Sequence, residues 1–147
     1  MNEFMKIAIK EAQKGIHQGH GGPFGCVIVK DGIIIGKGHN EVLKQNDPTC
    51  HGEMMAIHDA CNNLGTFDLT GCELYTTAAP CPMCLGAILW SNIKKYYYGC
   101  NTSDTEKIGF RDNIFFSNPI YSAEEINRNE CLAIFQEYVM LSNKKLY

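Results

Sequence analysis

Short runs of β-branched residues alternate with helical patterns along most of this chain, and this alternation limits the possible folds more than any other feature. The first two runs, at 26–30 and 33–37, flank an Asp31-Gly32 pair, which is a strong signal for a β-hairpin. Further strands are predicted over 72–77 and 93–99. Strands separated by helices are typical of α/β proteins. We therefore predict a three-layer α-β-α fold, with a mixed central sheet and helices on both of its faces.

The predicted helices lie around and between these strands. An amphipathic pattern opens the chain and ends before the glycine-rich segment 19–23. N-cap candidates and a proline in 46–49 predict the start of the next helix near 49–51, and Pro82 suits the first turn of the one after it. The four helices are expected at 4–16, from 49–51 onward, at 81–90 and at 123–140, whereas the polar segment 101–122 shows no clear period.

Length and composition favour one domain over residues 1–147. A chain of 147 residues that is 45% hydrophobic and 20% charged can bury most of its apolar surface in a single core. It shows no run of apolar residues long enough to cross a membrane and no secretory layout, which predicts a cytoplasmic protein without a membrane partner. The net charge is −3, and no run of Lys and Arg exceeds a pair, which disfavours a nucleic-acid partner.

Eight cysteines raise the question of a disulfide framework. Disulfides are rare in reducing compartments, so metal binding or simple burial is the better interpretation here. Cys81 and Cys84 alone stand at the spacing of metal ligands. The other six are expected to behave as small buried hydrophobic residues.

Two motifs carry the chemistry, and each lies at the predicted start of a helix. They are His51-Gly52-Glu53 and Pro80-Cys81-Pro82-Met83-Cys84. Two thiolates three positions apart on the first turn of a helix can bind one ion from the same side, and one imidazole completes three protein ligands. Three ligands leave the fourth position of zinc open for water, which is the arrangement of a catalytic site rather than a structural one. The sequence therefore predicts one Zn²⁺ held by His51, Cys81 and Cys84.

Glu53 is expected to act as the general acid and base at this site. Positions i and i+2 of a helix point in different directions, so Glu53 does not chelate beside His51 but can lean over the open coordination position. A redox Cys81-x-x-Cys84 pair has no use for Glu53, and a structural zinc site needs a fourth ligand. Cys50 is a poor fourth ligand because adjacent residues at a helix start point apart.

The chain resembles the cytidine and deoxycytidylate deaminase superfamily of zinc hydrolases, and within it the short guanine deaminases of bacteria. The metal motifs follow the H-x-E and P-C-x-x-C pattern of zinc deaminases. Other segments that carry the resemblance are 21–25, 38–40, 46–49, 83–90, 109–112 and 143–147. The resemblance implies a cytidine deaminase-like fold, one zinc ion per subunit, and a homodimer whose C-terminal tail, about residues 120–147, swaps between subunits.

The same resemblance implies the substrate contacts. An aromatic ring at Phe24 would stack on the base, Asn40 and the backbone near Gly52 would hydrogen-bond to it, and Trp90 would wall the pocket. Asp112 and Tyr147 would read the polar edge of the base, with Asp112 also counted among the catalytic residues. A planar base needs apolar stacking and a few directed hydrogen bonds, which these residue types supply.

The expected activity is hydrolytic deamination of a free purine base, from guanine and water to xanthine and ammonia. Gly52 and Ala79 depart from the commoner family pattern, so other substrates stay open: cytosine, cytidine, another amino-substituted heterocycle, or adenosine in tRNA. A zinc-stabilised binding module is the non-enzymatic alternative, although a binding module needs no general base at Glu53.

Overall fold

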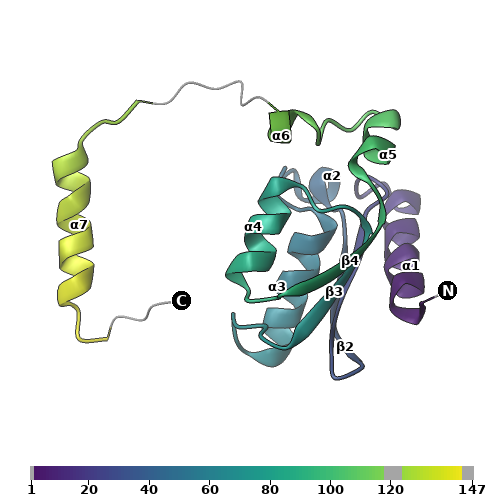
Figure 1. Cartoon of the computed structure of the whole chain (residues 1–147), viewed down its shortest axis with the longest axis horizontal. Helices are drawn as coiled ribbons and strands as arrows, with labels where there is room; N and C mark the ends of the chain where they lie inside the picture. The colour runs from purple at the N-terminus through teal and green to yellow at the C-terminus, as the bar shows by residue number, and fades with distance from the viewer. Residues whose placement is uncertain (1, 118–123, 144–147) are drawn as a thin grey trace.

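The computed structural model describes residues 2–117 and 124–143, and it contains one four-stranded sheet in the order β2-β1-β3-β4 (Figure 1). Strand β1 is antiparallel to both β2 and β3, whereas β3 and β4 are parallel. The mixed sheet predicted from the sequence is therefore confirmed. The bounds of the strands are β1 Gly25–Lys30, β2 Ile33–His39, β3 Cys72–Ala78 and β4 Lys95–Cys100.

Helices cover both faces of this sheet. Helix α1 (Glu3–His17) lies on one face, and helices α3 (Gly52–Leu64) and α4 (Pro82–Trp90) lie on the other (Figure 1). Because β3 and β4 are parallel, their connection has to cross over one face, and α4 makes that crossing. The predicted three-layer α/β architecture is thus confirmed.

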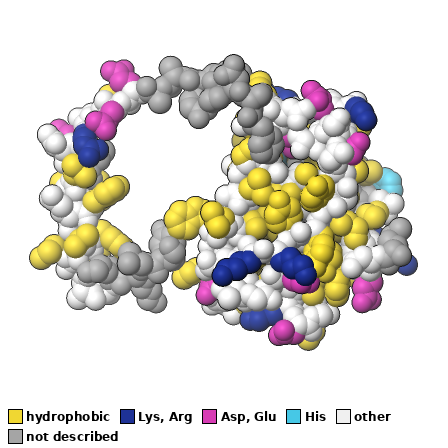
Figure 2. Space-filling view, viewed as in Figure 1, with side chains coloured by type: hydrophobic (Ala, Val, Ile, Leu, Met, Phe, Trp, Pro, Cys, Tyr) yellow, Lys and Arg dark blue, Asp and Glu magenta, His cyan; other side chains and the backbone are white. Residues whose placement is uncertain are grey.

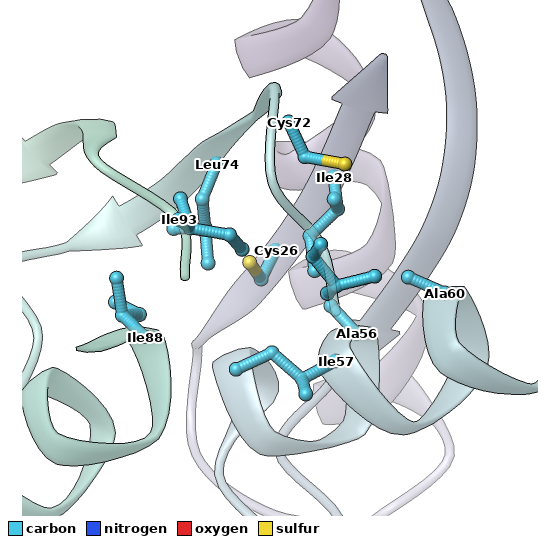
Figure 3. Close-up of a cluster of buried hydrophobic side chains, with 10 residues drawn as sticks. Cys26, Ile28, Ala56, Ile57, Ala60, Cys72, Leu74, Ile88 and Ile93 are labelled. Atoms are coloured by element: carbon cyan, nitrogen blue, oxygen red, sulfur yellow. The ribbon is translucent and has the colours of Figure 1, made fainter. Parts of the chain in front are cut away.

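The side chains of β1 alternate between two apolar clusters, as the period of a strand requires. Val27 and Val29 pack with Ala8 of α1 on one face. Cys26 and Ile28 point to the other face, where they join a larger cluster with Ala56 of α3 (Figure 3). A strand that is buried on both faces explains why its sequence is a continuous apolar run.

Two glycines let helices approach the sheet more closely than a side chain would allow. A Cβ built at Gly25 would lie 2.1 Å from the Ala8 carbonyl oxygen of α1. A Cβ at Gly38 would lie 2.6 Å from the Ala56 nitrogen of α3. Both distances are far below van der Waals contact, so these glycines set how close α1 and α3 lie to the sheet and where the first turn of α3 is placed.

The structure contains short helices that the sequence interpretation left as loops. They are α2 (Val42–Gln45), α5 (Thr102–Lys107) and α6 (Ile114–Ser117). A capping box marks the start of α5, because the Asn101 side chain accepts from the Asp104 N–H and the Asp104 carboxylate accepts from the Asn101 N–H. Asn101 followed three residues later by Asp104 is a sequence signal for a helix start, and it could have predicted α5.

Helix α7 (Arg128–Met140) stands apart from the sheet and its helices (Figure 1). Its apolar side chains are largely exposed, including Ile134 at 64%, Phe135 at 69% and Met140 at 84% (Figure 2). The sequence predicted a helix here from residue 123, and 118–123 lie outside the described residues. Within the described part of the chain, no helix combines the length and the apolar character needed to span a bilayer.

Candidate active site

The N-termini of α3 and α4 bring three metal-ligating side chains together. His51 is the N-cap of α3 and Cys81 is the N-cap of α4, both with extended backbone, and Cys84 lies in the first turn of α4. Pro82 at the first helical position supports this start, since it lacks an N–H that the helix could not use there. The Nδ1 atom of His51 lies 3.6 Å from the Sγ of Cys81 and 3.6 Å from the Sγ of Cys84.

These distances fit one zinc ion. A tetrahedral zinc with bonds of about 2.3 Å to sulfur and about 2.0–2.1 Å to nitrogen places N and S ligands about 3.5 Å apart. The three ligand atoms already lie within 4.8 Å of one another. Cys50 is not part of this group, and its thiol interacts with Asp47 instead. His51, Cys81 and Cys84 would therefore hold the ion without rearrangement and leave a fourth position open.

The ligand side chains shift the pKa values of one another. A hydrogen bond from Cys84, together with contact to His51, lowers the pKa of Cys81 to about 4. The same bond to Cys81 and burial raise the pKa of Cys84. The hydrogen bond to Cys81 raises the pKa of His51 against the opposing effect of burial. These contacts favour the thiolate at Cys81, and thiolates are the form in which cysteines bind a metal.

Glu53 is buried beside these ligands and held in place from two sides. It is 5% exposed. Its Oε1 accepts a hydrogen bond from the hydroxyl of Thr76 on β3 at 3.0 Å, and its Oε2 lies 3.5 Å from the Cys84 thiol. Burial raises the pKa of this carboxyl group, which suits a residue that takes up and releases protons near neutral pH.

A cavity of about 560 Å³ opens onto this group. His51, Glu53 and Cys81 form part of its wall, and Phe24, Asn40, Phe110 and Asp112 also line it. The structure therefore brings the predicted base-contacting residues Phe24, Asn40 and Asp112 to the same cavity as the metal ligands, although they come from segments far apart in the chain.

Phe24 is supported by Phe110, a residue that the sequence interpretation did not assign to the site. The two rings meet edge to face with centroids 4.8 Å apart. A Cβ at Gly22 would lie 2.7 Å from the Phe110 ring and 2.8 Å from the Phe24 ring, so Gly22 is required for this pair. The available signal was that Phe110 lies two residues before Asp112 in the 109–112 motif.

Asn40 is 5% exposed, and its amide group is oriented by the backbone. The backbone N–H of Asn40 donates to the Phe24 carbonyl at 2.8 Å, and the side-chain Oδ1 accepts from the Val42 N–H at 3.1 Å. The bond to Val42 fixes the orientation of the side-chain amide, and its NH₂ group is the part that can donate to a ligand in the cavity.

We expect Gly21→Ala to weaken ligand binding through Asn40. A Cβ at Gly21 would lie 2.0 Å from the Asn40 Oδ1, so the amide has to rotate away from Val42. The loss of one oriented hydrogen bond corresponds to an increase in KM of roughly tenfold, with kcat changed less. Steady-state kinetics measure this. Gly19→Ala adds a Cβ with no atom within 4 Å at a positive φ of 68°, so it is the control for backbone strain in this loop without a clash at Asn40. An unchanged KM in Gly21→Ala would contradict the role of the Asn40 amide.

The remaining predicted residues differ in their placement. Asp112 is half-buried in the cavity wall, where burial and the Cys81 thiolate raise its pKa. Gly52 is buried at the first position of α3, with its N–H at the helix start. Trp90 is 67% exposed and borders a separate hollow with Ile57 and Phe67, so its place in the pocket wall stays a prediction. Trp90 ends α4, and nine residues of helix at about 1.5 Å each carry it away from the ligands. Tyr147 lies outside the described residues.

Comparisons with known proteins agree with this geometry. Residues 1–100 match the family model of the cytidine and deoxycytidylate deaminase zinc-binding region, which includes His51, Glu53, Cys81 and Cys84. The guanine deaminase of Bacillus subtilis is 44% identical over 98% of this chain and 97% of its own length. Its crystal structure superimposes with a TM-score of 0.93 and covers 100% of this chain and 99% of that one.

A tRNA-specific adenosine deaminase of Aquifex aeolicus is 47% identical over 65% of this chain and 62% of its own length. The similarity to guanine deaminase therefore extends through the C-terminal part, whereas this second similarity covers a smaller share of both proteins. The family model, the relatives and the His51/Cys81/Cys84 group agree, and this chain belongs to the cytidine and deoxycytidylate deaminase family of zinc-binding proteins.

Proposed function

We propose that this protein deaminates guanine by hydrolysis, with xanthine and ammonia as products. The observation that carries the proposal is one cavity in which a three-ligand zinc site and the buried Glu53 meet residues suited to a planar base. The similarity over almost the full length of the Bacillus subtilis guanine deaminase supports guanine as the substrate.

The chain's own residues would hold the base in place. The Phe24 ring, supported by Phe110, offers a stacking surface, and the Asn40 NH₂ group can donate to a ring acceptor. Asp112 can accept hydrogen bonds from the N–H groups on the guanine edge. The N–H of Gly52 is one of the first in α3 and has no partner within the helix, so it can serve as a further donor.

The reaction adds water to the ring carbon that bears the amino group and then breaks the bond from carbon to nitrogen. Zinc bound by His51, Cys81 and Cys84 would supply a Lewis acid that lowers the pKa of the attacking water towards about 7. Glu53 would accept one proton from this water and deliver it to a ring nitrogen. It would then take the second proton from the added hydroxyl group and pass it to the amino group, which leaves as ammonia while the carbonyl forms. Asp112 would keep the base oriented during both steps.

The C-terminal part of the chain bears on the oligomeric state and on the substrate contacts. We propose that the chain forms a single domain whose C-terminal part, from about residue 120, packs on a second copy and brings Tyr147 to the partner's cavity. The exposed apolar side chains of α7, with Phe135 69% and Met140 84% exposed, support such packing because they need a cover. Size-exclusion chromatography with light scattering should then show a dimer, and removal of 124–147 should leave a monomer with a higher KM.

The cytoplasm is the compartment that fits this site. Cys81 and Cys84 have to stay as thiols to bind zinc, which a reducing environment ensures. The seven cysteines with described side chains are all free thiols, which agrees with this proposal.

Ammonia release from the zinc-loaded protein tests the function. Guanine, cytosine, cytidine, adenine and adenosine would be compared under the same conditions, with Glu53→Gln as the blank. We expect turnover of guanine that is absent in the blank. Turnover of another base would keep the zinc chemistry and overturn the substrate, and activity on tRNA that falls steeply with salt would identify a polynucleotide deaminase. A zinc-replete protein without turnover of any heterocycle would favour a binding module.

A further inference from the structure

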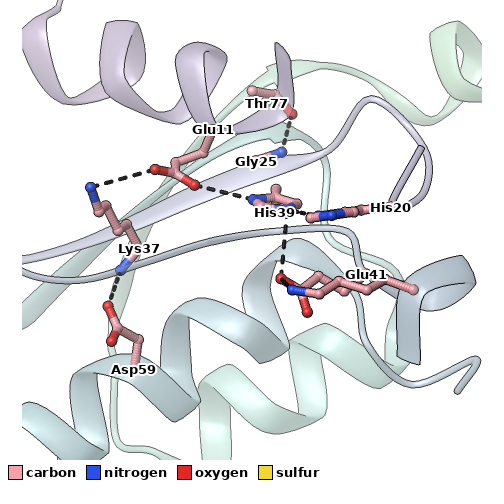
Figure 4. Close-up of polar contacts among 9 residues, drawn as sticks. Glu11, His20, Gly25, Lys37, His39, Glu41, Asp59 and Thr77 are labelled. Atoms are coloured by element: carbon pink, nitrogen blue, oxygen red, sulfur yellow. Dashed lines mark hydrogen bonds and ion pairs between the residues drawn. The ribbon is translucent and has the colours of Figure 1, made fainter. Parts of the chain in front are cut away.

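A second group of metal-type side chains lies outside the catalytic site, next to Asn40. It consists of His20, His39 and Glu41, which we call the His20 cluster (Figure 4). His20 Nδ1 lies 2.9 Å from His39 Nε2, and Glu41 Oε1 lies 3.6 Å from the same nitrogen. All three ligand atoms lie within 4.8 Å of one another.

The buried Glu11 orients His39 within this cluster. Glu11 Oε2 lies 3.1 Å from His39 Nδ1, and a carboxylate only accepts, so Nδ1 carries the proton. With Nδ1 facing Glu11, the other ring nitrogen, Nε2, faces His20 and Glu41. A carboxylate that fixes the second nitrogen of a histidine is the usual outer partner of a metal ligand.

The fold makes room for this arrangement. His39 is 4% exposed and packs against α1 at Gly15, where a Cβ would lie 2.7 Å from the imidazole. A glycine inside a helix costs helix stability relative to alanine, so α1 loses stability here to accommodate the ring. The backbone of His20 is anchored as well, because its carbonyl accepts from the N–H groups of Leu43 and Lys44.

The protonation states suit a cation. Partial desolvation and the charge of Lys44 lower the pKa of His20, a shift that favours the neutral form in which an imidazole binds a metal. Burial opposes ionisation of Glu41, but hydrogen bonds from Gln45 and Lys44 outweigh it and lower the pKa of this carboxyl group. Lys44 contacts the same Oε1 at 3.2 Å, but its side chain is 46% exposed, so it can turn into solvent when a cation takes its place.

We propose that His20, His39 and Glu41 bind one divalent transition-metal ion of the zinc class. Tetrahedral zinc with bonds of about 2.0–2.1 Å to nitrogen and oxygen spaces such ligands about 3.3 Å apart, and the distances of 2.9 and 3.6 Å lie on either side of this value. Two imidazoles with one carboxylate suit Zn²⁺, Co²⁺, Ni²⁺ or Fe²⁺ better than Ca²⁺ or Mg²⁺, which prefer oxygen ligands alone.

This ion would stiffen one wall of the active-site cavity. Its ligands flank Asn40 on both sides in the chain, and His20 directly precedes Gly21 and Gly22 of the cavity wall. The ion would thus connect the 20–22 segment to the 39–41 segment. The inference rests on the geometry of the cluster and does not depend on guanine being the substrate.

Isothermal titration of the zinc-loaded, full-length protein with Zn²⁺ tests the proposal. Wild type should bind a second equivalent per chain, and His20→Ala should abolish this event. Glu11→Gln should weaken it by about 10–100-fold, the usual cost of losing an outer partner of a metal ligand. His58→Ala, which removes an exposed histidine on α3 outside the cluster, should bind like wild type.

The outcome is decided by stoichiometry rather than activity. His20 is only half-buried, and a melting curve of His20→Ala without added metal checks that the variant stays folded. Glu41→Gln offers a second variant of nearly the same shape and should also lose the event. If wild type binds a single equivalent, or if His20→Ala and Glu41→Gln keep the second one, the proposal is overturned, and the cluster is a hydrogen-bonded pair of histidines between two carboxylates.

Discussion

Glu53→Gln should lower kcat by about 10²–10⁴ and leave the zinc content unchanged, because the glutamine keeps the shape of the side chain but cannot accept a proton. Glu53 is buried and is held by Thr76 and Cys84, so the amide can keep at least the hydrogen bond from the Thr76 hydroxyl through its oxygen. Ammonia release at saturating guanine, with metal analysis of the same sample, measures both quantities.

A matched control for this variant is Glu73→Gln on β3, a partly exposed carboxylate whose contacts are with Lys95 and Tyr75. It should keep wild-type turnover. Near-normal turnover in a fully metallated Glu53→Gln would refute the general acid and base role. A variant that loses its zinc as well would show that the defect lies in metal binding and not in proton transfer.

Removal of zinc should abolish the activity, and re-addition of zinc should restore it. We expect the ion to supply several kcal/mol of transition-state stabilisation, so its removal should lower kcat by roughly 10²-fold or more. Cys84→Ser should show the same loss permanently, because a buried hydroxyl at this position replaces a thiolate that the site needs. Chelation followed by metal analysis and an ammonia assay checks the first part.

The control for Cys84→Ser is Cys100→Ser, an exposed thiol at the end of β4. It should keep both zinc and turnover. Full activity in metal-free protein, or in Cys84→Ser, would contradict the assignment of Cys84 as a ligand. Recovery with Zn²⁺ distinguishes loss of the ion from unfolding, since unfolded protein would not regain turnover.

Local signals predicted most of the secondary structure. The Asp31-Gly32 pair marks the turn between β1 and β2, and Pro82 marks the first turn of α4. These features depend on residues a few positions apart, which a sequence pattern contains directly. The short helix α5 was not predicted, because six residues are too few to show a hydrophobic period. Its capping box of Asn101 and Asp104 was nevertheless visible in the sequence.

The ligand set was predicted for a similar reason. Cys81 and Cys84 share one helical turn, and Glu53 stands at a constant offset from His51. Trp90 lies outside the cavity that the metal ligands line in this chain, because proximity to Cys84 in the sequence does not place a residue near the metal. Along α4 each residue advances about 1.5 Å and turns by about 100°, so the end of the helix leaves the site.

The sequence by itself determined the four strands, the longer helices and the candidate set of His51, Cys81, Cys84 and Glu53, because helix starts, turns and ligand spacing are set by near neighbours in the chain. Only the tertiary structure decided that Thr76 holds Glu53, that Gly21 leaves space for the Asn40 amide, and that Phe110 supports Phe24. It also decided that Glu11, His20, His39 and Glu41 meet beside the cavity. These contacts join residues from different elements, and the packing of α1 and α3 on opposite faces of the sheet sets their distances.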